Sequence, residues 1–342
     1  MKRVNIALLG MGRIGKIHFK NIEQHFPGAR IAAVADPLYD TSLKDKYTNI
    51  YFSKDANEVI ALPGVDAILI CTPTSSHAEL IEKGIKNRKH IFCEKPMDLS
   101  LERTSALNSM AEEAGIKLML GFNRRFDPDF MQAYKSVREG TIGDIQIVKI
   151  TSRDPGLPPI DYIKNSGGLF MDMAIHDFDM ARYIMGKEVV EVFSKGLNII
   201  DKKVGEAGDI DTALTTLTFE DGTYAVIDNS RKAAYGYDQR LEIFGNEGMI
   251  QVENNLHHRN VLYNEKGIHH ALPLDFFMDR YAKSYLNEME LFIDALTGDR
   301  EMPAGGADGL KATQIAYAAK MSMETGRPVK LSDVNVKAKE MV

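Results

Sequence analysis

The sequence predicts an α/β protein of two domains, in which a doubly wound parallel sheet precedes an α+β domain with a large, mostly antiparallel, open-faced sheet. The first third alternates short apolar runs with helical patterns, as expected of strands buried on both faces and their crossover helices. Residues 188–264 then contain several strand-like segments and no long helix. The length, 342 residues, is too great for one ordinary core and fits two domains.

The strands of the first domain are expected to be almost entirely apolar. They are predicted at residues 4–9, 30–35, 66–71, 90–93 and 117–121. Helical patterns fall between them at 13–26, 56–62, 76–87 and 101–114, the last with Ser100 as its N-cap. Regular alternation of strand and helix implies a parallel sheet.

The pattern changes after Gly121, so we predict a first domain over residues 1–122 and a second over 123–342. Asp127-Pro128 is typical of a helix start, and Gly140 is expected to end that helix. A strand is predicted at 144–152 and a helix at 169–185. Hairpin turns are expected at 219–223 and 245–248, and two helices at about 276–296 and 308–325.

Composition excludes several classes of protein. The chain is 44% hydrophobic and 26% charged, which is ordinary for a globular protein. Its formal charge of −6 and the lack of a basic block argue against a nucleic-acid partner. The uncharged window around residues 67–71 ends at Glu79, which is too short for a membrane span. Cys71 and Cys93 form no disulfide framework. A cytoplasmic protein is expected.

A glycine-rich loop follows the first predicted strand. Residues 10–15 match G-x-G-x-x-G, and the predicted helix begins inside the motif. Asp36 closes the second strand, where a carboxylate would accept both adenosine ribose hydroxyls and repel a 2′-phosphate. We therefore expect NAD in preference to NADP. The alternative is a tight turn in a flavodoxin-like sheet with an unrelated loop aspartate.

Two further strand ends belong to the same edge of the sheet, where ligands of open α/β sheets bind. Residues 71–77 follow one strand, and Glu94-Lys95-Pro96 follows another. Ser75 or Ser76 could simply cap a helix, whereas Lys95 has little reason to be there for packing. The candidate cofactor contacts are Gly10, Gly12, Arg13, Ile14, Gly15, Asp36, Thr72, Pro73, Thr74, His77, Glu94, Lys95 and Arg124.

The predicted helix over 169–185 carries a polar stripe on an otherwise apolar surface. Asp172, His176, Asp179 and Tyr183 share one face at helical spacing, while Asp177 falls on the apolar side. Three interpretations of the stripe are open: a structural carboxylate–histidine pair, a metal site, or general acid–base chemistry. Zinc would need further ligands, and neither cysteine has zinc-site spacing, so we expect no metal.

A nicotinamide site in the same chain favours the third interpretation. Oxidation of a secondary alcohol removes a hydride from carbon and a proton from oxygen. The ammonium group of Lys95 would favour the deprotonated hydroxyl. His176 suits the base, and Asp172 suits the carboxylate that orients it. Lys95, Asp172 and His176 are therefore the candidate catalytic residues.

Taken together, these segments resemble the Gfo/Idh/MocA oxidoreductase family over essentially the whole chain. The matching segments are residues 10–15, Cys71-Thr72-Pro73, Glu94-Lys95-Pro96, Gly121-Phe122-Asn123-Arg124-Arg125-Phe126 and the helix with Asp172 and His176. The resemblance implies a Rossmann domain, an NAD cofactor and a catalytic lysine, aspartate and histidine at Lys95, Asp172 and His176. It also implies a cis Lys95–Pro96 bond, and a homotetramer assembled through the open sheet face.

Within the family, residues 152–155, 160–163 and 166–168 resemble the inositol-oxidising subgroup. This implies a cyclic polyol substrate, inositol first, contacted by Arg124 or Arg125, Asp154 and Tyr235, and less securely by Gln239. We predict substrate contacts at Lys95, Arg125, Asp154, Asp172, His176 and Tyr235. Each added position has a plain alternative: salt bridges for the arginines, a turn at Asp154 and packing for Tyr235.

Two other functions stay open. The same three residues could oxidise or reduce a pyranose sugar or its lactone, because fold and catalytic residues do not select the substrate. A protein of another class, a regulator that senses NAD without chemistry, is the second. Such a sensor would need none of Lys95, Asp172 and His176.

Overall fold

The chain divides into two compact units in this computed structural model, which describes residues 3–298 and 300–334. The first unit comprises residues 3–126 and 283–313, and the second comprises 127–282 and 314–334. The sequence predicted a single boundary after residue 122, whereas each unit consists of two segments of the chain. Most of the helix α11 (Ala282–Thr297) belongs to the first unit, because it packs there through its aromatic side chains. The ring of Phe292 lies 5.6 Å from that of Phe92.

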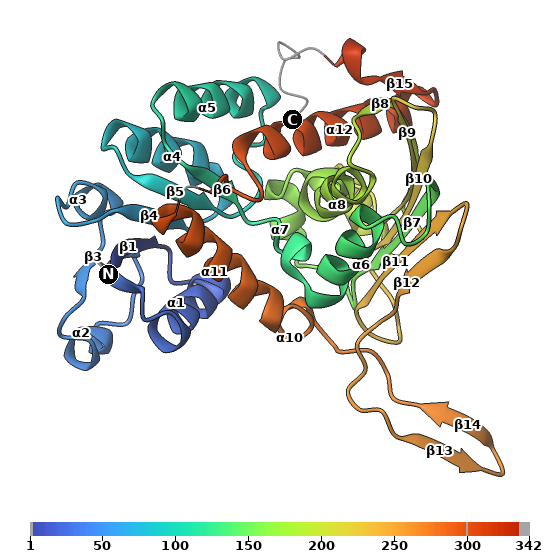
Figure 1. The fold of residues 1–342 in the computed structure, drawn as a ribbon, viewed down its shortest axis with the longest axis horizontal. Coiled ribbons are helices and arrows are strands. Elements are labelled where there is room, and N and C mark those ends of the chain that lie inside the picture. The colour runs from blue at the N-terminus through green and yellow to red at the C-terminus, as the bar shows by residue number, and fades with distance from the viewer. Residues whose placement is uncertain (1–2, 299, 335–342) are drawn as a thin grey trace. The chain divides into compact units, whose positions relative to one another are not determined.

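The first unit is built on a six-stranded sheet of order β3-β2-β1-β4-β5-β6 (Figure 1). All neighbouring strands pair in parallel, which confirms the predicted doubly wound sheet. Its strands are β1 (Val4–Leu9), β2 (Ala29–Ala35), β3 (Tyr51–Ser53), β4 (Ala67–Ile70), β5 (His90–Cys93) and β6 (Leu118–Leu120). Its helices are α1 (Arg13–His25), α2 (Ser42–Lys46), α3 (Ala56–Ile60), α4 (His77–Lys86), α5 (Leu101–Glu113) and the short η1 (Thr74–Ser76) and η2 (Asn123–Phe126).

The second unit contains a seven-stranded sheet of order β12-β11-β7-β10-β9-β8-β15. Only β7 and β10 pair in parallel, and the other pairs are antiparallel. Its strands are β7 (Ile145–Arg153), β8 (Val189–Leu197), β9 (Thr212–Phe219), β10 (Tyr224–Ser230), β11 (Asp238–Gly245), β12 (Met249–Val252) and β15 (Val329–Lys330). A separate hairpin of β13 (Val261–Asn264) and β14 (Gly267–His270) extends from this unit (Figure 1).

Among the described residues, helices lie on one face of the seven-stranded sheet (Figure 1). Alternate residues of β7, β9 and β10 are buried, as a period of two requires. The opposite face exposes large apolar side chains, among them Leu214, Tyr224 and Phe244. This confirms the predicted open-faced sheet. The remaining helices are α6 (Pro128–Arg138), α7 (Ile160–Asn165), η3 (Phe170–Ala174), α8 (Ile175–Met185), α9 (Lys202–Glu206), α10 (Phe277–Arg280), α12 (Gly306–Thr325) and η4 (Leu331–Asp333); residues 306–313 of α12 lie in the first unit.

Local chemistry sets several of these boundaries as predicted. The side chain of Ser100 caps α5, and that of Asp127 caps α6 with Pro128 at the first turn. Gly186 ends α8 at a φ of 63°, a conformation that favours glycine. Gly222, at a φ of 85°, turns β9 into β10. None of the helices in the described ranges is long and apolar enough to cross a bilayer.

Candidate active site

The glycine loop leaves β1 and packs closely against the end of β4. Gly10 has a φ of 94°, and a β-carbon there would lie 2.7 Å from the carbonyl oxygen of Cys71. A β-carbon at Gly12 would meet nothing within 4 Å, so the backbone is open on that side. No side chain caps the N-terminus of α1, which leaves its amides and positive potential for an anion. These features fit the pyrophosphate of a dinucleotide.

Asp36 directly follows β2 and forms a hydrogen bond with the glycine loop. Its Oδ2 accepts a hydrogen bond from the backbone amide of Met11 at 2.6 Å, and its Oδ1 accepts one from that of Leu38 at 2.7 Å. Each carboxylate oxygen can accept two hydrogen bonds. Asp36 therefore keeps one acceptor site on each oxygen for the two hydroxyls of a ribose.

We predict that Asp36→Ser narrows the preference for NAD⁺ over NADP⁺. The substitution removes the charge that would repel a 2′-phosphate, and each ~1.4 kcal/mol of lost discrimination changes the ratio tenfold. Measuring kcat/KM with both cofactors tests this, with Asp40→Ser as the control because Asp40 is an exposed carboxylate later in the same loop. An unchanged ratio would mean that Asp36 does not face the ribose.

Two strand-end loops are joined by His77, which is only 1% exposed. Its Nε2 lies 2.8 Å from the carbonyl oxygen of Thr72, and its Nδ1 lies 2.7 Å from that of Pro96. The Lys95–Pro96 peptide is cis. His77 is predicted above to touch the cofactor, but its ring is engaged on both sides. The structure places it as a brace between the loops that carry Thr72 and Lys95.

Lys95 follows the C-terminal end of β5 and is half-buried there. The preceding Glu94 contacts the ring of His18, with 3.1 Å between Oε1 and Nε2. A β-carbon at Gly121 would lie 2.7 Å from the other carboxylate oxygen of Glu94, so glycine makes room for that side chain. The backbone of Lys95 is thus held between a well-packed glutamate and a braced proline.

Arg124 and Arg125 lie in η2 and are both buried. Nη2 of Arg125 forms an ion pair with Asp308 at 3.0 Å, and its Nη1 donates to the carbonyl oxygen of Pro303. Arg125 therefore forms a salt bridge, which was the alternative to a substrate contact. Its predicted contact with substrate stays a prediction.

In the second unit, Asp172 lies in the π-helical turn η3 that precedes α8, a distortion often found at functional sites. Its Oδ1 accepts a hydrogen bond from the phenol of Tyr162 at 2.8 Å. Its Oδ2 lies 3.2 Å from Nη1 of Arg231. The carboxylate of Asp172 is therefore fixed from two sides.

Arg231 is the central cation of this cluster, and the sequence patterns did not single it out. Its side chain is 0% exposed, and Nη2 forms a second ion pair, with Asp209, at 3.2 Å. Burial alone would lower the pKa of Arg231, but neighbouring carboxylates outweigh burial and leave the pKa above its ordinary value. These carboxylates belong to Asp172, Asp209 and Asp154. Asp154 thus lies within electrostatic reach of the same guanidinium.

His176 lies one turn after Asp172 and is half-buried. The structure divides the rest of the predicted polar stripe. Asp179 is buried, and the ring of Tyr183 stacks on that of Tyr134 in α6 at 4.0 Å. Asp177, which the helical pattern left without an explanation, accepts a hydrogen bond from Asn229 of β10 at 2.8 Å.

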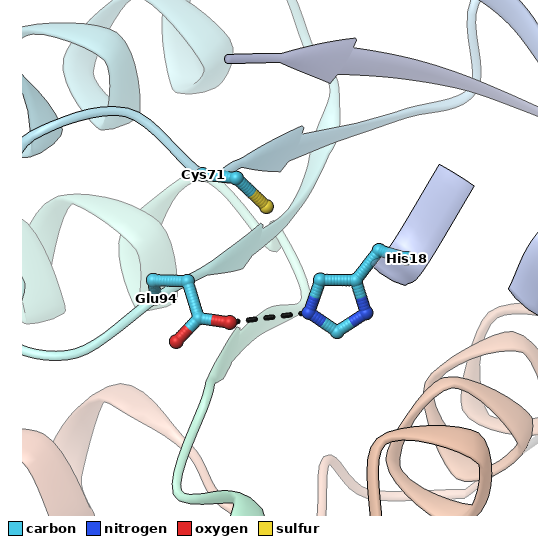
Figure 2. Close-up of side chains that lie close together, drawn as sticks. All are labelled: His18, Cys71 and Glu94. Carbon is cyan, nitrogen blue, oxygen red and sulfur yellow. Dashed lines mark hydrogen bonds and ion pairs between the residues drawn. The ribbon is translucent and has the colours of Figure 1, made fainter. Parts of the chain in front are cut away.

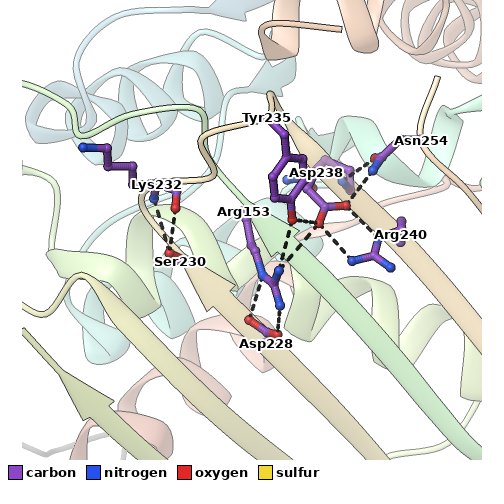
Figure 3. Close-up of polar contacts among 9 residues, drawn as sticks. Arg153, Asp228, Ser230, Lys232, Tyr235, Asp238, Arg240 and Asn254 are labelled. Carbon is purple, nitrogen blue, oxygen red and sulfur yellow. Dashed lines mark hydrogen bonds and ion pairs between the residues drawn. The ribbon is translucent and has the colours of Figure 1, made fainter. Parts of the chain in front are cut away.

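Tyr235 belongs to a second polar cluster, drawn in Figure 3. Its hydroxyl donates to Asp238 at 2.6 Å and accepts from Arg153 at 3.1 Å. Arg153 also pairs with Asp228. The alternating burial along β7 and β10 puts both residues on the open face of the sheet. Burial alone would raise the pKa of Asp238, but the hydrogen bonds that its carboxylate accepts outweigh burial and lower the pKa. Tyr235 therefore makes polar contacts, unlike the packing role that was the plain alternative.

Gln239, the less secure substrate contact, lies beside these residues but contacts the helix-covered side. Its Oε1 accepts from the hydroxyls of Ser152 at 3.2 Å and Tyr281 at 3.4 Å. Both partners are buried. The structure thus gives Gln239 a place inside the core of the second unit.

Comparison with known proteins places both units in one family. Residues 4–122 match the oxidoreductase family with an NAD-binding Rossmann fold, and residues 130–251 match the Gfo/Idh/MocA C-terminal domain. The myo-inositol 2-dehydrogenase of Thermotoga maritima is 45% identical over 333 residues, covering 97% of this chain and 99% of that protein. The chain belongs to the Gfo/Idh/MocA oxidoreductase family.

Two solved structures extend the match to the fold. The crystal structure of a probable dehydrogenase from Thermotoga maritima has a TM-score of 0.94 at 44% identity, covering 97% of this chain and 100% of that one. The scyllo-inositol dehydrogenase of Lactobacillus casei, with NAD(H) and scyllo-inositol bound, has a TM-score of 0.89 at 31% identity, with the same coverage. The cofactor of this oxidoreductase is NAD.

Proposed function

We propose that this protein oxidises a secondary hydroxyl of a cyclic polyol with NAD⁺, and that its first substrate is myo-inositol, which becomes the 2-keto-inositol. The 45% identity to the myo-inositol 2-dehydrogenase of Thermotoga maritima over nearly the whole of both chains carries the choice of substrate. The described residues support this chemistry: Gly10 turns closely against the end of β4, Asp36 accepts a hydrogen bond from the glycine loop, and Asp172 and His176 lie one helical turn apart.

The cofactor is held, in this proposal, by the glycine loop, the N-terminus of α1 and Asp36, and when bound it supplies the hydride acceptor. Thr72, Pro73, Thr74, Glu94 and Arg124 line the strand ends beside it. His77 acts indirectly, because it braces the loops of Thr72 and Pro96.

We assign the proton chemistry to Lys95, Asp172 and His176. The ammonium of Lys95 stabilises negative charge on the substrate oxygen. His176 accepts the hydroxyl proton. Asp172, fixed by Tyr162 and Arg231, stabilises the imidazolium that forms.

Polyol recognition follows from the carboxylates around Arg231. Asp154 can accept hydrogen bonds from two adjacent ring hydroxyls, which is how an acid recognises a polyol. Arg125 and Tyr235 are the further contacts of the proposal, and a substrate hydroxyl would have to share them with Asp308 and Asp238 respectively.

A substrate panel tests the proposal. NADH formation should be seen with myo-, scyllo- or chiro-inositol at a kcat/KM well above that for glucose, xylose and their lactones, because a site built for hydroxyl groups rejects analogues that leave its polar groups unpaired. Faster turnover of a pyranose would favour the alternative substrate class. No turnover of any polyol or sugar, with NAD⁺ still bound, would favour a sensor.

Assembly is part of the proposal. The open face of the sheet exposes apolar side chains, including Leu214, Tyr224 and Phe244. Apolar patches of this kind are usually buried by a partner. In this proposal the partner is the same face of a second copy, within a symmetric homotetramer. We also propose a cytoplasmic location, where NAD⁺ is available to a dehydrogenase.

A further inference from the structure

Three side chains with metal-binding donor atoms meet in the first unit, and a fourth, buried acid lies on a helix that packs against them; the proposed reaction uses none of the four as a catalyst. His18 comes from α1, Cys71 follows β4, Glu94 follows β5 and Glu288 comes from α11. One donor atom each of His18, Cys71 and Glu94 lies within 4.8 Å of the other two (Figure 2). Figure 2 shows the Cys71 sulfur pointing into the space beside the imidazole of His18 and the carboxylate of Glu94.

Glu288 supplies the independent observation that points to a ligand. It is 0% exposed, and neither of its carboxylate oxygens has a hydrogen-bond partner among the described residues. A buried carboxyl group without a partner is costly, and native proteins normally satisfy such a group with protein, water or an ion. The carboxyl group of Glu288 therefore calls for a polar ligand.

The packing of α11 places Glu288 beside the same cluster. The ring of Tyr285, three residues before Glu288, lies 5.6 Å from that of His18. The ring of Phe292, four residues after it, lies 5.6 Å from that of Phe92 in β5. Residues three and four apart share one face of a helix, so Glu288 lies on the face of α11 that packs against His18 and β5.

We propose that His18, Cys71, Glu94 and Glu288 bind one divalent cation of the zinc type. The imidazole nitrogen of His18, the thiolate of Cys71 and a carboxylate oxygen of Glu94 are the ligand types that Zn²⁺ takes, and a carboxylate oxygen of Glu288 would supply the fourth. The nitrogen and sulfur donors select against Mg²⁺ and Ca²⁺, which prefer oxygen ligands throughout. The spacing of the two cysteines in the sequence predicts no such site, because three of the four ligands come from other elements of the fold.

The position of this cation suggests its effect. Cys71 directly precedes Thr72, and Glu94 directly precedes Lys95. A cation that joins Cys71 to Glu94 would therefore fix the two strand ends that carry proposed cofactor contacts. We assign it a structural role in the NAD-binding unit, outside the proton chemistry.

Cobalt titration of the full-length protein tests the proposal, because a Co²⁺–thiolate bond gives an intense charge-transfer band in the near ultraviolet. We expect the band to saturate at one Co²⁺ per chain, to be displaced by Zn²⁺ and to be unaffected by excess Mg²⁺. Cys71→Ser should abolish the band. Cys93→Ser is the matched control, because Cys93 is buried in the adjacent strand but is not one of the proposed ligands.

Other outcomes would overturn the proposal. Absence of the band from the folded wild-type protein, or its survival in Cys71→Ser, would exclude the site. His18→Gln provides a second ligand variant if Cys71→Ser fails to fold, and it should weaken Co²⁺ binding at least tenfold. Equal affinity in Glu288→Gln would remove Glu288 from the ligand set and leave a buried water as its partner. The readout needs no turnover, so it is independent of the proposed reaction.

Discussion

Lys95→Ala should lower kcat for inositol oxidation by about 10²–10⁴-fold, the usual contribution of one group that stabilises charge or handles a proton in the transition state. NAD⁺ affinity should change much less, because the glycine loop and Asp36 provide most of the proposed cofactor contacts. Steady-state kinetics together with NAD⁺ titration separates the two quantities.

Lys86→Ala is the matched control for this variant, because Lys86 is an exposed lysine of α4 in the same unit. It should behave as wild type. If Lys95→Ala keeps near-normal kcat, the ammonium group does not act on the reacting hydroxyl. If it loses NAD⁺ binding and kcat together, Lys95 serves the cofactor and the assigned proton chemistry is wrong.

Arg231→Met should destabilise the protein by about 3–5 kcal/mol, the range measured when one partner of a buried ion pair is removed. The side chain of Arg231 is fully buried between Asp172 and Asp209, so its loss leaves two carboxylates without compensation. Urea unfolding followed by circular dichroism measures the change. We also expect kcat to fall, because Asp172 loses one of the groups that fix its carboxylate.

Arg182→Met is the control for stability. Arg182 also pairs with a carboxylate, that of Glu188 at 2.6 Å, but Glu188 is 44% exposed. Exposed pairs contribute about 0–1 kcal/mol, so this variant should unfold close to the wild type. Equal stability of Arg231→Met and wild type would show that the two aspartates tolerate burial without the guanidinium.

The parts of the fold that sequence patterns predicted are those decided by local chemistry. The glycine loop, the Ser100 and Asp127 caps and the hairpin at Gly222 each depend on a few adjacent residues. The apolar strands of the parallel sheet carry their own signal as well, because strands buried on both faces lack polar alternation.

The parts that the sequence did not predict depend on contacts between distant segments. Arg231 has no motif around it, and its role comes from ion pairs to residues 22 and 59 positions away. Likewise, α11 returns to the first unit through ring contacts such as that of Tyr285 with His18. In the sequence, Arg231 is one basic residue of the strand-rich segment 188–264, and no local pattern links it to Asp172 or Asp209.

The candidate site shows the same division. Lys95, Asp172 and His176 could be proposed from their segments, because each lies in a motif or at helical spacing. Glu288 lies on a C-terminal helix with no such pattern, and only the fold packs that helix against His18, through the ring of Tyr285.

Hydride transfer from the polyol is the central claim, and deuterium labelling tests it most directly. Wild-type protein incubated with NAD⁺ and myo-inositol deuterated at carbon 2 should form singly deuterated NADH, with one keto-inositol produced for each. Formation of unlabelled NADH would place the oxidised hydroxyl on another carbon. Failure to form any reduced cofactor from myo-, scyllo- or chiro-inositol would contradict the account.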